Sequence, residues 1–114
     1  MKDPIILLKH ILDSIANIES FSNGLSQAGF KKDKLRQSAI IRQIEIIGEA
    51  AKNVPTDFSS KHPEIKWNEI AGSRDKLIHH YFGVDLDIVW EIIEKDIPRL
   101  KEKIKHIISS NKTK

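Results

Sequence analysis

The residues best suited to chemistry lie in the segment WNEIAGSRDKLIHHYF, which runs from Trp67 to Phe82. On a helix, the apolar side chains of this segment share a face about 100° wide, namely Trp67, Ile70, Leu77, Ile78 and Tyr81. Arg74 lies near the centre of that face. Because arginine stays charged when buried, Arg74 must reach water, pair with a carboxylate or face an anion-binding groove. Its position leaves two interpretations open, a functional anion site and a structural or subunit-interface ion pair.

Two histidines and a tyrosine follow the arginine on the same predicted helix. Helical geometry places Tyr81 about 20° from Arg74 but His79 about 140° away, and His80 points to another face again. His79 and Arg74 therefore meet only if two copies of the chain face each other across a two-fold contact. The alternative for a histidine near a helix end is a capping or dipole role. The same structural role is the interpretation for His10, His62 and His106.

These residue types suit the cleavage of RNA without a metal ion. That reaction needs a group that titrates near neutral pH to move a proton, and a fixed cation to stabilise the charged phosphorane. Histidine and arginine supply these two groups. The chain has no cysteine and no HExxH, EF-hand or phosphate-binding glycine motif, so the sequence predicts neither a metal site nor a cofactor.

Two acids could support such a site. Glu45 and Glu49 are four residues apart, with Arg42 close by, on the polar face of a helix whose opposite face is rich in isoleucine. One interpretation is a solvated face of ion pairs. The other is that one of these acids orients His79 or Arg74 across a helix or dimer contact.

Helical periodicity and helix-start signals account for most of the chain. Asp3 and Pro4 begin an amphipathic helix to about residue 20, and further helices are expected over 33–53 and from 67 to about 82, where Gly83 stops the third. A loose turn is expected at 26–31, and an irregular stretch with a short helical turn at 56–66. Asp85 is the expected N-cap of a fourth helix. Asp96-Ile97-Pro98 places a kink or a new helix start within this last helix.

The elements predict an all-α fold. No segment alternates with period 2, and four amphipathic helices close most simply as an antiparallel four-helix bundle with a kinked last helix. Gly48, in the middle of the second long helix, indicates that a neighbouring helix crosses closely there. The expected organisation is one helical domain over residues 1–110 followed by a basic tail at 111–114.

Composition is that of a globular protein, with 114 residues and a net charge of +3. This mild positive excess permits nucleic-acid binding without requiring it. Seven lysines or arginines fall in residues 95–114, and a solvated tail accounts for them. No apolar run is long enough to cross a membrane and the N-terminus does not resemble a signal peptide, so we expect a soluble cytoplasmic protein.

The segment around the arginine carries a family resemblance. Arg74, His79 and Tyr81 fit the R-x4-H-x-Y signature of the HepT toxins, which belong to the HEPN superfamily of small helical ribonucleases. The likeness extends over most of the chain, through GLS (24–26), IIRQIEIIGEAAKNV (40–54) and HPEIKWNEIAGSRDKLIHHYFGVDLDIVWEIIEKDIPRLKEKI (62–104). The sequence therefore resembles the HepT family both in its motif and along its length.

The resemblance implies a HEPN-like bundle that forms a homodimer and places two motifs in one cleft. It implies metal-independent endoribonuclease activity with Arg74 and His79 as the catalytic pair. It also implies a type VII toxin-antitoxin pair, in which an MntA-like nucleotidyltransferase antitoxin neutralises the toxin by transferring AMP to Tyr81. Asp75 matches a small polar position of the superfamily, which suggests that it supports Arg74. His80 fills a variable position and receives no role.

A second hypothesis is a non-catalytic HEPN module that binds a nucleotidyltransferase partner or a nucleotide and cleaves nothing. The intact Arg74 and His79 argue against it, because a decayed site would have been free to lose one of them. The geometry of the motif further predicts that the dimer surface includes the end of the third long helix.

Overall fold

The computed structural model describes residues 3–78 and 85–112, with the side chains of residues 74–78 and 112 outside that description. The described residues contain helices and no strand, which confirms the predicted all-α class. The helical elements in chain order are α1 (Pro4–Ser22), α2 (Gln27–Lys32), α3 (Lys34–Lys52), α4 (Thr56–Ser60), α5 (Trp67–Ile78), α6 (Leu86–Glu91), the π-helical turn η1 (Ile92–Asp96) and α7 (Ile97–Lys112).

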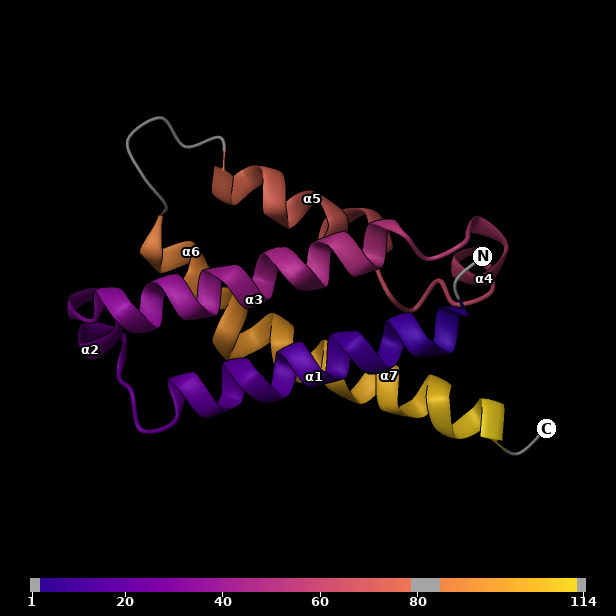
Figure 1. The fold of residues 1–114 in the computed structure, drawn as a ribbon, viewed down its shortest axis with the longest axis horizontal. Helices are drawn as coiled ribbons and strands as arrows, with labels where there is room; N and C mark the ends of the chain where they lie inside the picture. The colour runs from indigo at the N-terminus through magenta and orange to yellow at the C-terminus, as the bar shows by residue number, and fades with distance from the viewer. Residues whose placement is uncertain (1–2, 79–84, 113–114) are drawn as a thin grey trace.

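Four long rods make up the bundle. α1 and α3 run antiparallel, α5 returns along α3, and α6, η1 and α7 together form one bent rod (Figure 1). α1 packs against both α3 and α7, while α5 packs mainly against α3. The short α2 packs against α3 and α6. α3 therefore lies between α1 and the helix that carries the predicted arginine.

The helix starts follow the local capping signals. The side chains of Asp3, Ser26, Asp33 and Asp85 each accept a hydrogen bond from a backbone N–H in the first turn of the helix that follows. These bonds satisfy N–H groups that have no partner within the helix. The predicted starts at Asp3 and Asp85 are confirmed. The expected turn at 26–31 is the helix α2, and the helical turn expected within 56–66 is α4.

The core is built from the predicted apolar stripes, which are rich in isoleucine. Its fully buried side chains include Leu8, Ile11, Ile15, Ile18, Phe30, Ile40, Val89, Ile104 and Ile107. Gly48 is also buried, on the helix that packs against α5. Burial of these stripes supplies the main driving force for folding, and each helix contributes one apolar face to it.

The kink predicted at residues 96–98 is confirmed and takes the form of a π turn. Pro98 has no N–H, and its ring would clash with the carbonyl four residues earlier in a regular α-helix. The helix widens just before it, and the Ile97 N–H donates to the Ile92 carbonyl five residues back. One extra residue is thereby accommodated in the turn. Ile97 and Leu100 still enter the core.

Some expectations fall beyond the described residues. α5 is described as far as Ile78, so the predicted continuation to Phe82 and the stop at Gly83 lie outside the description. The proposed division into a domain at 1–110 and a tail at 111–114 stays a prediction. Within the described helices, none combines the length and apolar character needed to cross a membrane.

Candidate functional site

The first turn of α5 is held by aromatic packing. The Trp67 indole N–H donates to the His62 carbonyl at 3.0 Å, and the Trp67 ring meets Phe58 edge-on with centroids 6.5 Å apart. The His62 ring lies 4.6 Å from Phe58, centroid to centroid, which gives this histidine a structural environment. These contacts fix where α5 begins, and hence where the backbone of Arg74 lies two turns later.

Only the first part of the predicted motif lies within the residues that the structure describes. Arg74 and Asp75 lie on α5, and their side chains are outside the description. His79, His80 and Tyr81 lie outside the described residues altogether. The grouping of Arg74 with His79 and Tyr81 therefore stays a prediction from sequence.

The predicted acids lie on α3, the helix beside α5. Glu45 is half-buried and Glu49 exposed, on the face of α3 opposite its buried isoleucines, as predicted. They line a shallow groove of about 340 Å³ between α1 and α3, whose other lining residues are Leu7, His10, Arg42, Ile46, Ala50 and Asn53. Because α3 packs against α5, the helix that carries Glu45 and Glu49 lies beside the helix that carries Arg74. A contact from Glu45 or Glu49 to Arg74 itself stays a prediction.

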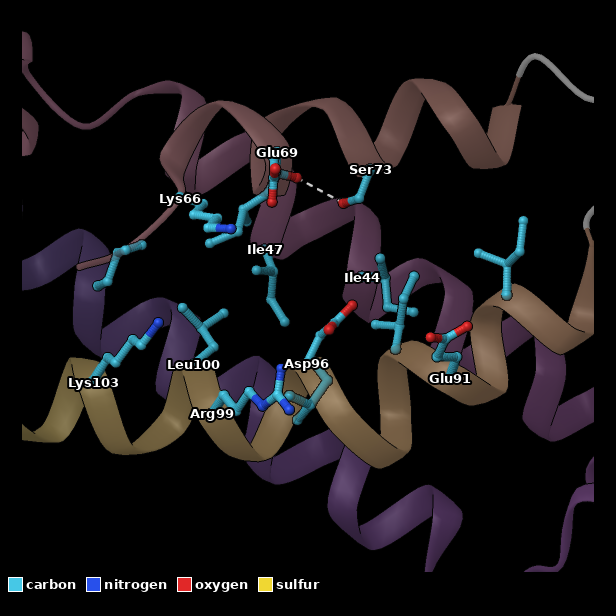
Figure 2. A pocket seen from close by; sticks show the side chains of 15 residues that line it. Ile44, Ile47, Lys66, Glu69, Ser73, Glu91, Asp96, Arg99, Leu100 and Lys103 are labelled. Carbon is cyan, nitrogen blue, oxygen red and sulfur yellow. Dashed lines mark hydrogen bonds between the residues drawn. The ribbon is translucent and has the colours of Figure 1, made fainter. Parts of the chain in front are cut away.

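A larger groove, of about 430 Å³, separates α5 from α6, η1 and α7 (Figure 2). Its floor is apolar and includes Ile44 and Ile47 of α3. Its charged lining residues are Lys66, Glu69, Glu91, Asp96, Arg99 and Lys103. Ser73, the residue before Arg74, also lines this groove, and its hydroxyl donates to the Ile70 carbonyl at 2.7 Å. The groove therefore reaches the position next to the predicted catalytic arginine.

Sequence reasoning did not find this larger groove. Two signals pointed toward it, the break before Pro98 and the basic residues that follow it. The sequence predicts a solvated tail for these basic residues, whereas Arg99 and Lys103 line the groove and Lys101 bonds to Glu19 of α1 at 2.9 Å. Within the described part of the chain, no three His, Asp or Glu side chains gather closely enough to hold a metal ion.

Comparison with known proteins identifies the family. The family model described as "Ribonuclease HepT-like" matches residues 11–107, which run from Ile11 in α1 to Ile107 in α7. This chain belongs to the HepT-like ribonuclease family. The HepT resemblance read from the motif and its flanking segments is thereby confirmed, together with the helical HEPN fold that it implies.

Named relatives of this HepT-like chain come from bacteria and archaea. A Caldanaerobacter subterraneus protein named "Putative RNase" is 46% identical over 112 residues, covering 98% of this chain and 100% of that protein. A Thermococcus cleftensis protein named "Probable ribonuclease HepT" is 49% identical over 100 residues, 88% of this chain and 91% of that protein. A Methanocaldococcus jannaschii protein named "Gamma-glutamylcyclotransferase and putative RNase" is 50% identical over 107 residues, 94% of this chain.

The chain spans 48% of the length of that last relative, about half of it. The HepT-like region is therefore one part of a longer protein in that case. No solved structure matches this chain at a significant level.

Proposed function

We propose that this chain is a metal-independent endoribonuclease, the toxic component of a toxin-antitoxin pair that acts in the cytoplasm. The observation that carries the proposal is the family match over residues 11–107 in a chain that has both Arg74 and His79 at the motif spacing. Relatives of nearly the same length are named as RNases. The proposed substrate is RNA, and the proposed active unit is a homodimer.

In the proposed reaction, the ribose 2′-hydroxyl attacks the adjacent phosphorus. The 2′-oxygen–phosphorus bond forms, the bond from phosphorus to the 5′-oxygen breaks, and the products are a 2′,3′-cyclic phosphate and a free 5′-hydroxyl. His79 moves the proton from the 2′-hydroxyl or to the leaving oxygen, since imidazole titrates near neutral pH. Arg74 stabilises the charge that develops on the phosphorane.

The homodimer solves a geometric problem in this mechanism. Arg74 and His79 point about 140° apart on one helix, so a single copy does not direct both toward one phosphate. A two-fold axis beside α5 places the arginine of one copy near the histidine of the other. The contacts of Trp67 hold the start of α5 in place, and a helix in a fixed position is what a site shared between two copies needs.

The first experiment measures cleavage of an RNA oligonucleotide with and without EDTA. Cleavage is expected to survive EDTA and to leave a 2′,3′-cyclic phosphate. Arg74→Ala and His79→Ala are each expected to lower the rate by about 100-fold or more, because each removes a group that acts in the transition state. His80→Ala, the matched neighbour, is expected to retain most activity.

Circular dichroism and native mass spectrometry show whether each variant keeps its helicity and mass. Loss of cleavage in EDTA would contradict metal independence, and full activity of His79→Ala would contradict the assigned base. If the wild-type protein cleaves no RNA yet binds a nucleotidyltransferase, the non-catalytic module is the correct function.

We further propose that a nucleotidyltransferase antitoxin controls the site through Tyr81. The tyrosine oxygen attacks the α-phosphorus of ATP, pyrophosphate leaves, and an AMP group remains on Tyr81. Because Tyr81 is about 20° from Arg74 on the predicted helix, the added phosphate lies close to the guanidinium and occupies the path of the RNA. Charge and bulk then both oppose substrate binding.

This control is tested by incubating the protein with ATP, Mg²⁺ and an MntA-like nucleotidyltransferase. Peptide mass spectrometry is expected to place a single added AMP on Tyr81, with loss of RNA cleavage in proportion. The Tyr81→Phe variant is expected to gain no AMP and to stay active. Transfer to another residue, or ATP-dependent silencing of Tyr81→Phe, would contradict the mechanism.

A further inference from the structure

The most basic stretch of the sequence lies where α2 meets α3. In the window KKDKLR, residues 31–36, four of the six residues are lysine or arginine, and no other six-residue window has as many. They are Lys31 and Lys32 at the end of α2, and Lys34 and Arg36 in the first turn of α3. All four are exposed, and we call them the basic corner.

Two of these four bases have no partner within the described part of the chain. Lys31 Nζ pairs with the carboxylate of Asp87 on α6, and the Arg36 guanidinium pairs with Asp33 at 2.8 Å. Over the residues that the structure describes, the other two lysines of the basic corner take part in no ion pair or side-chain hydrogen bond. The basic corner therefore keeps two uncompensated positive charges.

The basic corner lies at the end of the bundle toward which the predicted motif runs. α3 and α5 are antiparallel, so the end of α5 points toward the start of α3 (Figure 1). Ser73 of α5 and Ile44 of α3 both line the larger groove and lie at a similar level along it (Figure 2). From that level, α5 continues about 7.5 Å to Ile78, and α3 leads back about 15 Å to Lys34. Ile78, which directly precedes His79, thus ends roughly 8 Å short of the basic corner along the bundle.

The chain after the motif returns to the same corner. The described structure resumes at Asp85, the N-cap of α6, and α6 packs against α2. Gln27 and Lys31 of α2 both bond to Asp87 in the first turn of α6. The Asp85 carboxylate is itself bonded to two backbone N–H groups of α6. The described residues on both sides of the motif segment therefore lie at the end of the bundle that carries the basic corner.

The larger groove suits a polyanion less well. Its charged lining comprises three bases and three acids, so it has no net charge to attract phosphates. Lys66 and Lys103 lie together at the start of α5, whereas Ser73 lies toward the other end of the groove (Figure 2). The basic corner, by contrast, combines an excess of positive charge with a place at the motif end of α5.

We propose that the basic corner binds the phosphate backbone of RNA to one side of the cleaved bond, with Lys32 and Lys34 as the main contacts. The inference rests on the proposed ribonuclease function and extends its substrate-binding surface beyond the motif. Ammonium groups that contact phosphates fix the position of a nucleic acid and read no base. The two lysines are positioning residues, which hold the strand while its cleaved phosphate lies at Arg74.

An exposed leucine within the basic corner defines the alternative to be tested. Leu35 is 81% exposed and lies between Lys34 and Arg36. Lysines around an exposed apolar side chain also suit the surface of a membrane with anionic lipids. RNA is favoured because the basic corner lies beside the helix of the predicted motif, and because one leucine buries little apolar area in a bilayer.

The first experiment measures binding of a short fluorescent RNA whose 2′-O-methyl groups block the attacking oxygen, so that the probe is not cleaved. The corner variant is Lys32→Gln/Lys34→Gln. The matched control, Lys9→Gln/Lys105→Gln, changes the net charge equally at two exposed lysines, on the halves of α1 and α7 that lie toward the chain termini (Figure 1). By fluorescence anisotropy at low salt, the corner variant is expected to bind about tenfold more weakly than the wild type, and the control within about twofold of it.

Salt dependence identifies the kind of contact. For a single strand, the logarithm of the binding constant falls with the logarithm of the salt concentration by about 0.7 for each phosphate that the protein neutralises. The slope of the corner variant is therefore expected to be smaller in magnitude by about 1.4, and the loss of affinity to be the same for oligonucleotides of different sequence. An equal loss in the corner variant and the control, or an unchanged salt slope, would overturn the inference.

Kinetics with a cleavable RNA separate positioning from catalysis. In the corner variant, KM is expected to rise about tenfold while kcat stays within about twofold, because the phosphate contacts are the same in the bound substrate and in the transition state. A fall in kcat at unchanged KM would contradict a positioning role.

Vesicles that contain phosphatidylserine test the alternative. The wild type and the corner variant are expected to bind them equally weakly. Vesicle binding that the corner variant loses while its RNA binding stays unchanged would show that the basic corner contacts a membrane instead. Circular dichroism and thermal unfolding check that every variant keeps its fold.

The outcomes separate this inference from the proposed function. If the corner variant cleaves RNA with the KM of the wild type, the ribonuclease proposal stands and the basic corner is not part of the RNA-binding surface. If the corner variant loses affinity for the uncleaved probe but no preparation cleaves RNA, the binding surface stands and the ribonuclease proposal fails.

Discussion

The side-chain carboxylate of Asp87 links two short helices, α2 and α6. It accepts from Lys31 Nζ at 2.6 Å and from Gln27 Nε2 at 2.9 Å, which joins α6 to α2. The hydrogen bond from Lys31, aided by the one from Gln27, holds the pKa of Asp87 below its usual value. A carboxyl group whose pKa is lower in the folded chain stabilises the fold above its unfolded pKa of about 3.9. This contribution disappears as the pH falls through the folded value.

We therefore expect Asp87→Asn to lower stability slightly at pH 7 and to have almost no effect once the pH lies well below the lowered pKa of Asp87. The effect is small because the pair is exposed to solvent. Urea unfolding of both proteins across this range measures the difference. The control is Asp13→Asn on the exposed face of α1, which should show no comparable pH dependence. An Asp87 effect that is the same at every pH would refute the assignment.

The short helix α2 depends on tertiary packing. Six residues are too few for a helix that is stable alone. Its Phe30 is fully buried and packs against the Trp90 ring of α6, with ring centroids 5.5 Å apart. Phe30 therefore anchors α2 in the core, beside the polar contacts of Gln27 and Lys31 with Asp87.

Phe30→Ala is expected to lower the free energy of unfolding by about 3–5 kcal/mol, through lost burial and the cavity that remains. Leu35→Ala, a nearby apolar position that is 81% exposed, is expected to change it by less than about 0.5 kcal/mol. Chemical denaturation of the two variants beside the wild type gives both values. Similar losses for both would show that burial does not explain the role of Phe30.

The helices could be predicted from sequence because their signals are local. Aspartates identify the starts of α1, α3 and α6, and apolar residues at three- and four-residue spacing identify the buried face of each rod. The π turn is different. Pro98 signals a break, but the form of the break depends on Ile97 and Leu100 keeping their places in the core, which is a tertiary requirement. The larger groove could not be predicted either, because it depends on α5 packing against α3 and not against α7.

The candidate site could be predicted in part. Arg74 attracts attention from sequence because a permanent charge interrupts an apolar stripe, and the structure places it on a helix beside the one that carries Glu45 and Glu49. The relation between Arg74 and His79 is not a property of one helix. It depends on how two copies meet, which the spacing of residues in one chain does not determine.

At the scale of the whole molecule, dimerisation would make the stability of the folded state depend on the protein concentration. If two copies pair as proposed, mass action favours the folded dimer as the protein concentration rises. The midpoint of thermal unfolding is expected to rise by a few degrees for each tenfold increase in concentration. A wild-type midpoint independent of concentration would indicate that folding and association are not linked.

The contact between α1 and α7 also determines when the core can close during synthesis of the chain. Lys101 reaches back across 82 positions to Glu19, and Ile104 and Ile107 share the core with the first helix made. During synthesis, α3 covers one side of α1 early, but the other side waits for α7. At 5–20 residues per second, the ribosome needs roughly 2 to 9 seconds to pass from the end of α3 to the start of α7. For that interval the apolar side of α1 that packs against α7 has no partner, so the core of this protein closes only when its last helix is made.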